Sequence, residues 1–142
     1  MIELSDQHLA FLQAQRVGHL ATADAQGQPH VIPVCYACDA SAIYIALDAK
    51  PKRVAPQQLK RVRNILENPQ AALVVDRYDE DWSRLAYVFV RGTADLILSP
   101  SEEHDHAVAL LRARYTQYRT MPIDQQPVIR IRPQRVTAWG DL

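Results

Sequence analysis

Residues 16–39 read RVGHLATADAQGQPHVIPVCYACD, and they predict a β-hairpin. Two apolar, β-branched runs flank the polar turn Ala25–Gln28, in which Gly27 supplies the backbone freedom that a tight turn needs. A third strand is predicted in SAIYIALD, residues 41–48, because every second residue from Ile43 is apolar. Three consecutive strands joined by short turns indicate an antiparallel meander.

Beyond this meander, the sequence alternates helices with pairs of strands. Helices are predicted where apolar residues recur with a helical period behind a capping residue, and strands are predicted where they alternate. The predicted helices are residues 4–15 (capped by Ser5), 57–69 and 99–118 (capped by Ser99), and the further strands are residues 71–78, 84–98, 127–132 and 134–139. Strands in hairpin-like groups do not fit parallel βαβ units. The order predicts one domain over residues 1–142, with a mainly β (α+β) fold in which an antiparallel barrel is flanked by three helices.

The composition is that of a globular protein, with 48% hydrophobic and 23% charged residues in 142. Sixteen basic residues balance 16 acidic ones, so general affinity for nucleic acid or an anionic membrane is not expected. No apolar run reaches the length of a membrane span, and the N-terminal MIELSDQHLAFLQ carries acids where a signal peptide has Lys or Arg. A soluble cytoplasmic protein is therefore predicted.

One charge cluster stands out in residues 50–63, KPKRVAPQQLKRVR, which contain six cations and no acid. Its first part follows a predicted strand end, where loops commonly carry function. Its second part, with Lys60, Arg61 and Arg63, lies off the apolar stripe of the next helix. A solvated helix face is the alternative interpretation. Charge-assisted contacts to phosphate contribute roughly 1.5–3 kcal/mol each. Two or three of them hold one phosphate, so six cations indicate a ligand with more anionic character.

Other residues with reactive side chains do not form a recognisable metal or nucleophile site. Cys35 and Cys38 lie in an apolar, β-branched stretch, so buried strand cysteines are predicted in preference to a redox pair or zinc ligands. The acidic run DRYDEDW, Asp76 to Trp82, lacks the glycine and the terminal glutamate of a calcium loop. His104 and His106 do not share a helix face. No metal is predicted, and no catalytic side chain is assigned.

Several segments together resemble the pyridoxamine 5'-phosphate oxidase-like (PPOX class) split β-barrels, which bind FMN or the deazaflavin coenzyme F420. RVGHLATADAQGQPHVIPV (16–34) resembles the first hairpin of that family, NILENP (64–69) its helix after the phosphate loop, and RPQRVTAW (132–139) its closing strands. The combination of K-P-K-R, N-P and D-x-Y-x-x-D-W is similar to the subgroup of probable F420-dependent oxidoreductases. The resemblance implies an FMN-binding split β-barrel.

The resemblance also implies a cofactor site. Strand residues that would lie along the flavin-type ring are His30, Ile32, Pro33 and Val34. Cations that would meet the phosphate are Lys50, Lys52 and Arg53, together with Arg61, at a helix position where relatives keep a lysine, and its neighbour Lys60. Family members are homodimers with sites at the subunit interface, so Trp82 and Trp139 would come from the partner chain. The C-terminal IRPQRVTAWGDL lacks the Arg/His substrate segment of true pyridoxamine-phosphate oxidases, which argues against a B6 vitamer as substrate.

The predicted function is hydride transfer between the cofactor and an unidentified small organic substrate. F420 is preferred over FMN, because its phosphodiester and glutamate tail suit six cations better than a single phosphate does. One alternative is a non-catalytic protein that binds or sequesters FMN or haem. Another is an RNA-binding barrel, but the strands lack the stacked aromatics that such a surface uses. His30 and Tyr36 are the nearest candidates for a general acid, and neither is assigned.

Overall fold

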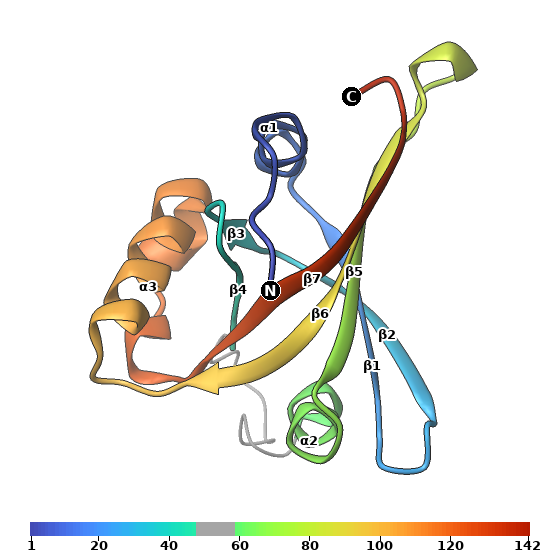
Figure 1. Ribbon diagram of the computed structural model, residues 1–142. Coiled ribbons are helices and arrows are strands. Elements are labelled where there is room, and N and C mark those ends of the chain that lie inside the picture. Colours follow the sequence, from blue (N-terminus) through green and yellow to red (C-terminus); the bar gives the residue numbers. More distant parts are fainter. Residues whose placement is uncertain (48–58) are drawn as a thin grey trace.

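The computed structural model describes residues 1–47 and 59–142 (Figure 1). Three predicted phosphate ligands, Lys50, Lys52 and Arg53, lie outside the described residues. The α-helices of the described part are α1 (Asp6–Ala14), α2 (Lys60–Glu67) and α3 (Glu102–Arg114). Short 3-10 helices are η2 (Trp82–Arg84), η3 (Thr116–Arg119) and η4 (Ile123–Gln125). The strands are β1 (Gly18–Ala23), β2 (Pro29–Val34), β3 (Ala37–Cys38), β4 (Ile43–Ala46), β5 (Gln70–Arg77), β6 (Ala86–Ile97) and β7 (Val128–Gly140).

These strands form one antiparallel sheet in the order β2-β1-β5-β6-β7-β4-β3. The long strands β6 and β7 curl the sheet into a half-barrel (Figure 1). Their register shifts between Arg91 and Gly92. A Cβ at Gly92 would lie 2.1 Å from the carbonyl oxygen of Arg132, so only glycine permits this close approach. The antiparallel split β-barrel predicted from the sequence is confirmed.

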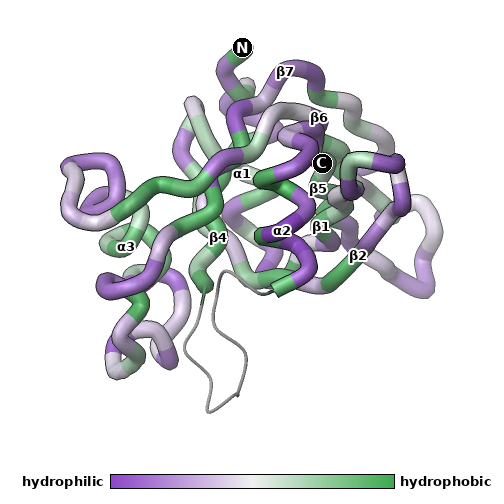
Figure 2. The backbone as a smooth tube through the Cα atoms, turned by 90° about the horizontal axis from the view of Figure 1, so that it is seen from below, coloured by the Kyte–Doolittle hydropathy of each residue, from purple (hydrophilic) through white to green (hydrophobic). Residues whose placement is uncertain are grey.

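The helices are fixed by packing on both sides of this sheet. β4 is buried on both faces, because Ile43 and Ile45 join the core inside the barrel while Tyr44 and Ala46 join the core beneath α3. The barrel core also takes up Phe11 and Leu12 from α1 and Val62 and Ile65 from α2. Hydrophobic and hydrophilic residues alternate along α2 (Figure 2), as expected for a helix with one buried side.

Two predicted boundaries were wrong. The third helix is capped by Ser101, whose Oγ accepts the backbone N–H of His104 at 3.1 Å, and not by Ser99. The two strands predicted at 127–132 and 134–139 are one strand, β7. Pro133 pairs with Gly92 at the register shift, where the regular ladder is interrupted and a residue without an N–H is tolerated.

Candidate functional site

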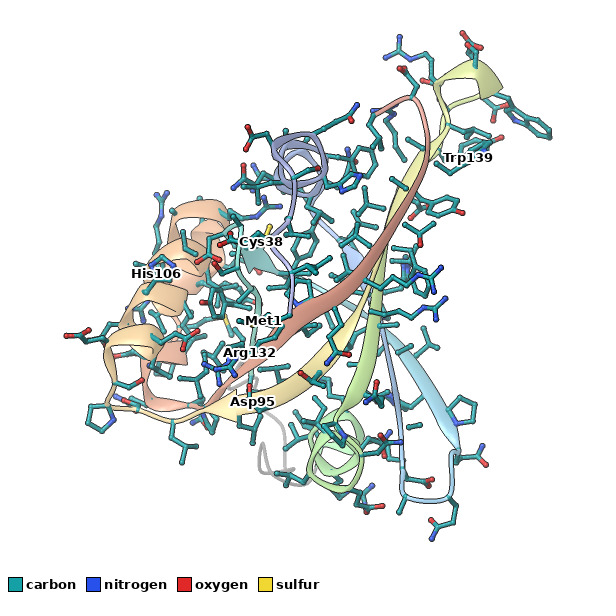
Figure 3. All side chains as sticks on the ribbon, in the orientation of Figure 1. Met1, Cys38, Asp95, His106, Arg132 and Trp139 are labelled. Carbon is teal, nitrogen blue, oxygen red and sulfur yellow. The ribbon has the colours of Figure 1, made fainter. Side chains whose placement is uncertain are left out.

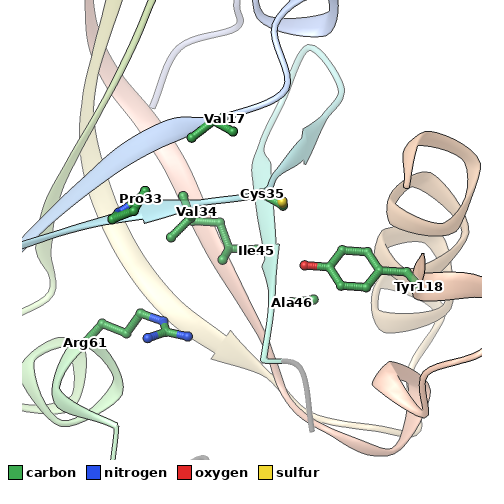
Figure 4. A pocket seen from close by; sticks show the side chains of 8 residues that line it. All are labelled: Val17, Pro33, Val34, Cys35, Ile45, Ala46, Arg61 and Tyr118. Carbon is green, nitrogen blue, oxygen red and sulfur yellow. The ribbon is translucent and has the colours of Figure 1, made fainter. Parts of the chain in front are cut away.

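A cavity of about 180 Å³ opens where the ends of β2 and β4 approach α2 (Figure 4). Val34 and Ile45 give it an apolar floor, and Arg61 of α2 and Tyr118 of η3 point toward this floor from opposite sides. The residues that line this first cavity are Val17, Pro33, Val34, Cys35, Ile45, Ala46, Arg61 and Tyr118. An apolar surface flanked by a cation and a phenol fits a planar ring that carries an anionic group.

Arg61 is positioned by the packing of α2 on the β1–β2 hairpin. The buried side chain of Asn64 donates from Nδ2 to the hydroxyl of Thr22 at 3.1 Å. One turn away, Lys60 Nζ lies 3.7 Å from a carboxylate oxygen of Asp24 in the hairpin turn. These two contacts fix α2 against the β1–β2 hairpin, and they thereby fix the position of Arg61.

The first turn of α2 is suited to an anion. Leu59, at the N-cap, has no side-chain oxygen that could cap the backbone N–H groups of the first turn, and the turn contains no acid. Backbone N–H groups, that of Gln28 above all, and the ammonium of Lys60 hold the pKa of Asp24 below its ordinary value. Asp24 is therefore ionised at neutral pH, and it offsets part of the positive charge of Lys60.

A second, larger cavity of about 650 Å³ adjoins the first, and Cys35 and Tyr118 line both. It lies between the residues that follow α1 and the segment from the end of α3 through η3. The residues that line it are Arg16, Cys35, Arg114, Tyr115, Thr116, Gln117, Tyr118 and Met121. The two cavities together offer space for a cofactor ring and a second molecule.

Tyr36 and Cys38 are unsuited to proton transfer or redox chemistry. The hydroxyl of Tyr36 donates to the carbonyl of Leu12, and burial raises the pKa of this phenol well above its ordinary value. Burial also raises the pKa of the Cys38 thiol, to about 12. Cys35 is only partly buried, at the cavity wall. The prediction of buried cysteines is confirmed for Cys38 and wrong for Cys35.

Three of the predicted site residues meet at the first cavity: Pro33 and Val34 on β2, and Arg61 on α2. His30 and Ile32 lie nearer the hairpin turn on β2 and do not line the cavity. The Nδ1 atom of His30 is buried without a hydrogen-bond partner in the described part of the chain. The roles of these residues toward a cofactor stay predictions.

The two tryptophans lie elsewhere. Trp82 is 70% exposed in η2, which joins β5 to β6, and Trp139 is 53% exposed near the end of β7 (Figure 3). Trp139 stacks on Tyr87 with ring centroids 5.9 Å apart. Neither tryptophan lines the two cavities, so a role at either one requires a second subunit.

Sequence reasoning did not identify Cys35 and Tyr118 as cavity residues. Tyr118 falls at the end of the helix predicted over residues 99–118, but α3 ends at Arg114 and the chain turns into η3, which contains Tyr118. Cys35 directly follows β2, and the end of a strand is a common place for site residues. Its position after a strand could have identified Cys35 as a cavity residue. The position of Tyr118 at the cavity depends on a turn that the helical pattern of the sequence does not reveal.

The curled antiparallel sheet, with its cavity between strand ends and an adjoining helix, defines a split β-barrel. The chain belongs to the pyridoxamine 5'-phosphate oxidase family, whose model matches residues 4–140. The resemblance noted in the sequence is thus confirmed. Within the described residues, no helix combines the length and apolar character needed to cross a membrane.

Similar proteins include both a reductase and a haem protein. The 5a,11a-dehydrotetracycline/5a,11a-dehydrooxytetracycline reductase of Streptomyces rimosus is 26% identical over 137 residues, which cover 96% of this chain and 82% of the reductase. HutZ, the haem storage protein of Vibrio cholerae, matches with a TM-score of 0.75 and 17% identity, covering 98% of this chain and 95% of HutZ. A protein described as F420 reductase matches with a TM-score of 0.69 and 24% identity, covering 94% of this chain and 98% of the reductase.

Proposed function

We propose that this protein is an oxidoreductase that uses F420 or FMN to transfer a hydride to or from a small organic substrate. The observation that carries the proposal is the first cavity, where the apolar ends of β2 and β4 meet the guanidinium of Arg61. When bound, the cofactor would supply or accept the hydride, with solvent exchanging the accompanying proton. The protein would hold the ring along Pro33 and Val34 and exclude water from it.

The phosphate would bind at the start of α2. Arg61 would contact it, helped by the backbone N–H groups of the first turn of α2 and by the preceding basic residues Lys50, Lys52 and Arg53. Because Lys60 pairs with Asp24, one of the six cations is not available to the anionic part of the cofactor. Our preference for F420 over FMN therefore depends on the remaining five.

A homodimer with the sites at its interface completes the proposal. The outer face of the sheet carries a depression of about 540 Å³ lined by His19, Val74, Asp76, Tyr87 and Phe89. The stacked ring of Trp139 adjoins it through Tyr87, and Val31 on β2 is 63% exposed. An exposed apolar patch of this kind is typical of a subunit interface. In a dimer, Trp82 and Trp139 would reach the site of the partner chain.

Titration of the purified protein with F420 and, separately, FMN tests the proposal. Arg61→Ala is expected to raise the dissociation constant of the cofactor about 10- to 100-fold, which corresponds to the loss of one charge-assisted phosphate contact. Arg132→Ala, which removes an exposed arginine of β7 away from the cavity, is the matched control and should leave the dissociation constant unchanged. Equal effects of the two substitutions, or no affinity for either cofactor, would contradict the proposal.

A second candidate is a protein that binds or sequesters haem or FMN without turnover. HutZ, named as a haem storage protein, shares the fold, and the partly exposed sulfur of Cys35 lies on the wall between the two cavities, where a thiolate can ligate haem iron. Absorbance spectra separate the candidates. A Soret band that is lost in Cys35→Ser, with no affinity for F420 or FMN, favours haem binding.

A further inference from the structure

The second cavity is built around two arginines at the junction of two helix ends. Arg114 is the last residue of α3, and it donates from Nη1 to the carbonyl of Gln13 at 2.7 Å and from Nη2 to the carbonyl of Gln15. Arg16, which follows α1, donates from Nη1 to the carbonyl of Arg114. Arg114 therefore binds the carboxyl end of α1, and Arg16 binds the carboxyl end of α3.

Both guanidiniums are also held against aromatic rings. Arg114 lies over the rings of Tyr36 and Tyr115, with its Cζ 5.2 and 5.3 Å from their centroids. Arg16 lies 5.8 Å from the centroid of Tyr115. The hydroxyl of Tyr115 donates toward the carbonyls of Arg16 and Tyr36, at 2.8 and 2.9 Å. The positions of both cations are thus defined by the fold.

Their charge is only partly balanced. In the part of the chain that the structure describes, neither guanidinium forms an ion pair with a carboxylate. Each helix carboxyl end carries about half a negative charge, so the two ends offset about one of the two positive charges. About one positive charge remains at the cavity. Among the described residues, the Nε of Arg114 is buried without a hydrogen-bond partner, and the exposed Arg16 donates from one of its nitrogens, Nη1.

Besides the arginines and the polar side chains of Thr116 and Gln117, the cavity has an aromatic and apolar wall. The rings of Tyr115 and Tyr118 meet edge to face at 5.5 Å, and Met121 beside them is a flexible apolar surface. One unbalanced cation beside aromatic walls is suited to a molecule with a flat apolar body and a single carboxylate. A carboxylate matches the planar fork of a guanidinium with two parallel hydrogen bonds.

We propose that the second cavity binds the substrate, and that this substrate is an organic carboxylate with a planar, largely apolar body whose anionic group contacts Arg16. The proposal rests on the proposed function, because it takes the first cavity as the place of the cofactor ring. The shared wall of Cys35 and Tyr118 would then bring the substrate body beside that ring. Arg16 is a binding residue here, and Arg114 contributes positive charge from behind it.

Calorimetric titration with two matched probes tests this inference: 2-naphthoate, and its neutral counterpart 2-naphthamide. The protein is expected to bind the naphthoate at least about tenfold more tightly than the amide, the value of one charge-assisted contact. Arg16→Gln should abolish this preference, and Arg16→Lys, which keeps the charge, should retain most of it. Arg132→Gln, at an exposed arginine of β7 (Figure 3), is the control and should leave both affinities unchanged.

Three results would overturn the inference: equal affinity for the two probes, no binding of either, or a preference for the carboxylate that persists in Arg16→Gln. The same titrations with and without added FMN or F420 separate this inference from the proposed function. Binding of 2-naphthoate to a protein that takes up neither cofactor contradicts only the proposed function. Uptake of a cofactor without any selectivity for the carboxylate contradicts only the inference about the second cavity.

Discussion

The two cavities hold their arginines in opposite ways. Arg61 is carried by α2, and the side chains of Asn64 and Lys60 fix this helix to the neighbouring hairpin. Arg16 and Arg114 instead bind backbone carbonyls at two helix ends that lie far apart in the sequence. Arg114, which binds two carbonyls at the end of α1, contributes to the fold itself, whereas Arg61 on the docked helix would contact the cofactor under the proposed function. Changes at the two sites should therefore separate stability from cofactor affinity.

The wall that the two cavities share provides the largest expected effect. Cys35 lines both cavities, while Cys38 is buried and the pKa of its thiol is raised from 9.0 to about 12. Three pKa units correspond to about a thousandfold less thiolate at neutral pH, and the thiolate is the nucleophile. Iodoacetamide should therefore modify Cys38 of the native protein about a thousandfold more slowly than an ordinary exposed cysteine, and Cys35 at the cavity wall should react faster than Cys38, as measured by peptide mass spectrometry.

The single variants complete this comparison. Cys38→Ser should keep the fast reaction, and Cys35→Ser should leave only the slow one until denaturant is added. Bound FMN or F420 should slow the reaction of Cys35, because the ring would cover it. Similar rates for the two cysteines in the native protein would show that the second cavity does not open to solvent beside Cys35.

Arg114→Met is the next largest change. It removes the charged donor from the carbonyls of Gln13 and Gln15 at the end of α1, and hydrogen bonds to charged groups contribute about 1.5–3 kcal/mol each. We expect a loss of about 3 kcal/mol in the free energy of unfolding, measured by urea denaturation. Arg135→Met should cost less than about 0.5 kcal/mol, as for most surface positions. Under conditions in which both variants are fully folded, their cofactor affinity should be unchanged. A large loss of cofactor affinity in Arg114→Met would mean that the two cavities are coupled.

The fold could be predicted because its signals are local. The hairpin of residues 16–39 contains β1 and β2 around Gly27, whose φ of 83° is a conformation that glycine adopts readily. Ser5 caps α1 as expected, accepting the N–H of His8 at 3.1 Å. The break predicted at Pro133 was wrong, because the register shift opposite Gly92 lets the strand continue through a proline. That shift is a property of the paired strands and is not visible in either one alone.

In the candidate site, too, the residues with a local sequence signal could be predicted and those placed by tertiary contacts could not. Arg61 was identified from its charge cluster and family motif, both of which are contiguous in the sequence. Arg16 and Arg114 carry no such signal, since the contact between them joins residues 98 positions apart. Tyr118 likewise falls within the predicted helix of residues 99–118, and only the end of α3 at Arg114 places it at the cavity. Residues placed by tertiary contacts could not be recognised before the helices were assembled.

Asn64→Ala should cost less stability than Arg114→Met, but it should lower both stability and cofactor affinity. It leaves the buried hydroxyl of Thr22 without its donor, at a cost of about 2 kcal/mol in the free energy of unfolding. Thr22→Val should be less than additive with it, with a coupling of about 1 kcal/mol in a double-mutant cycle. Because Asn64 fixes the helix that carries Arg61, the affinity for FMN or F420 should also fall, unlike in Arg114→Met. Destabilisation by Asn64→Ala with undiminished cofactor affinity would show that α2 is held in place by its apolar residues Val62 and Ile65, and that the polar contact serves only the fold.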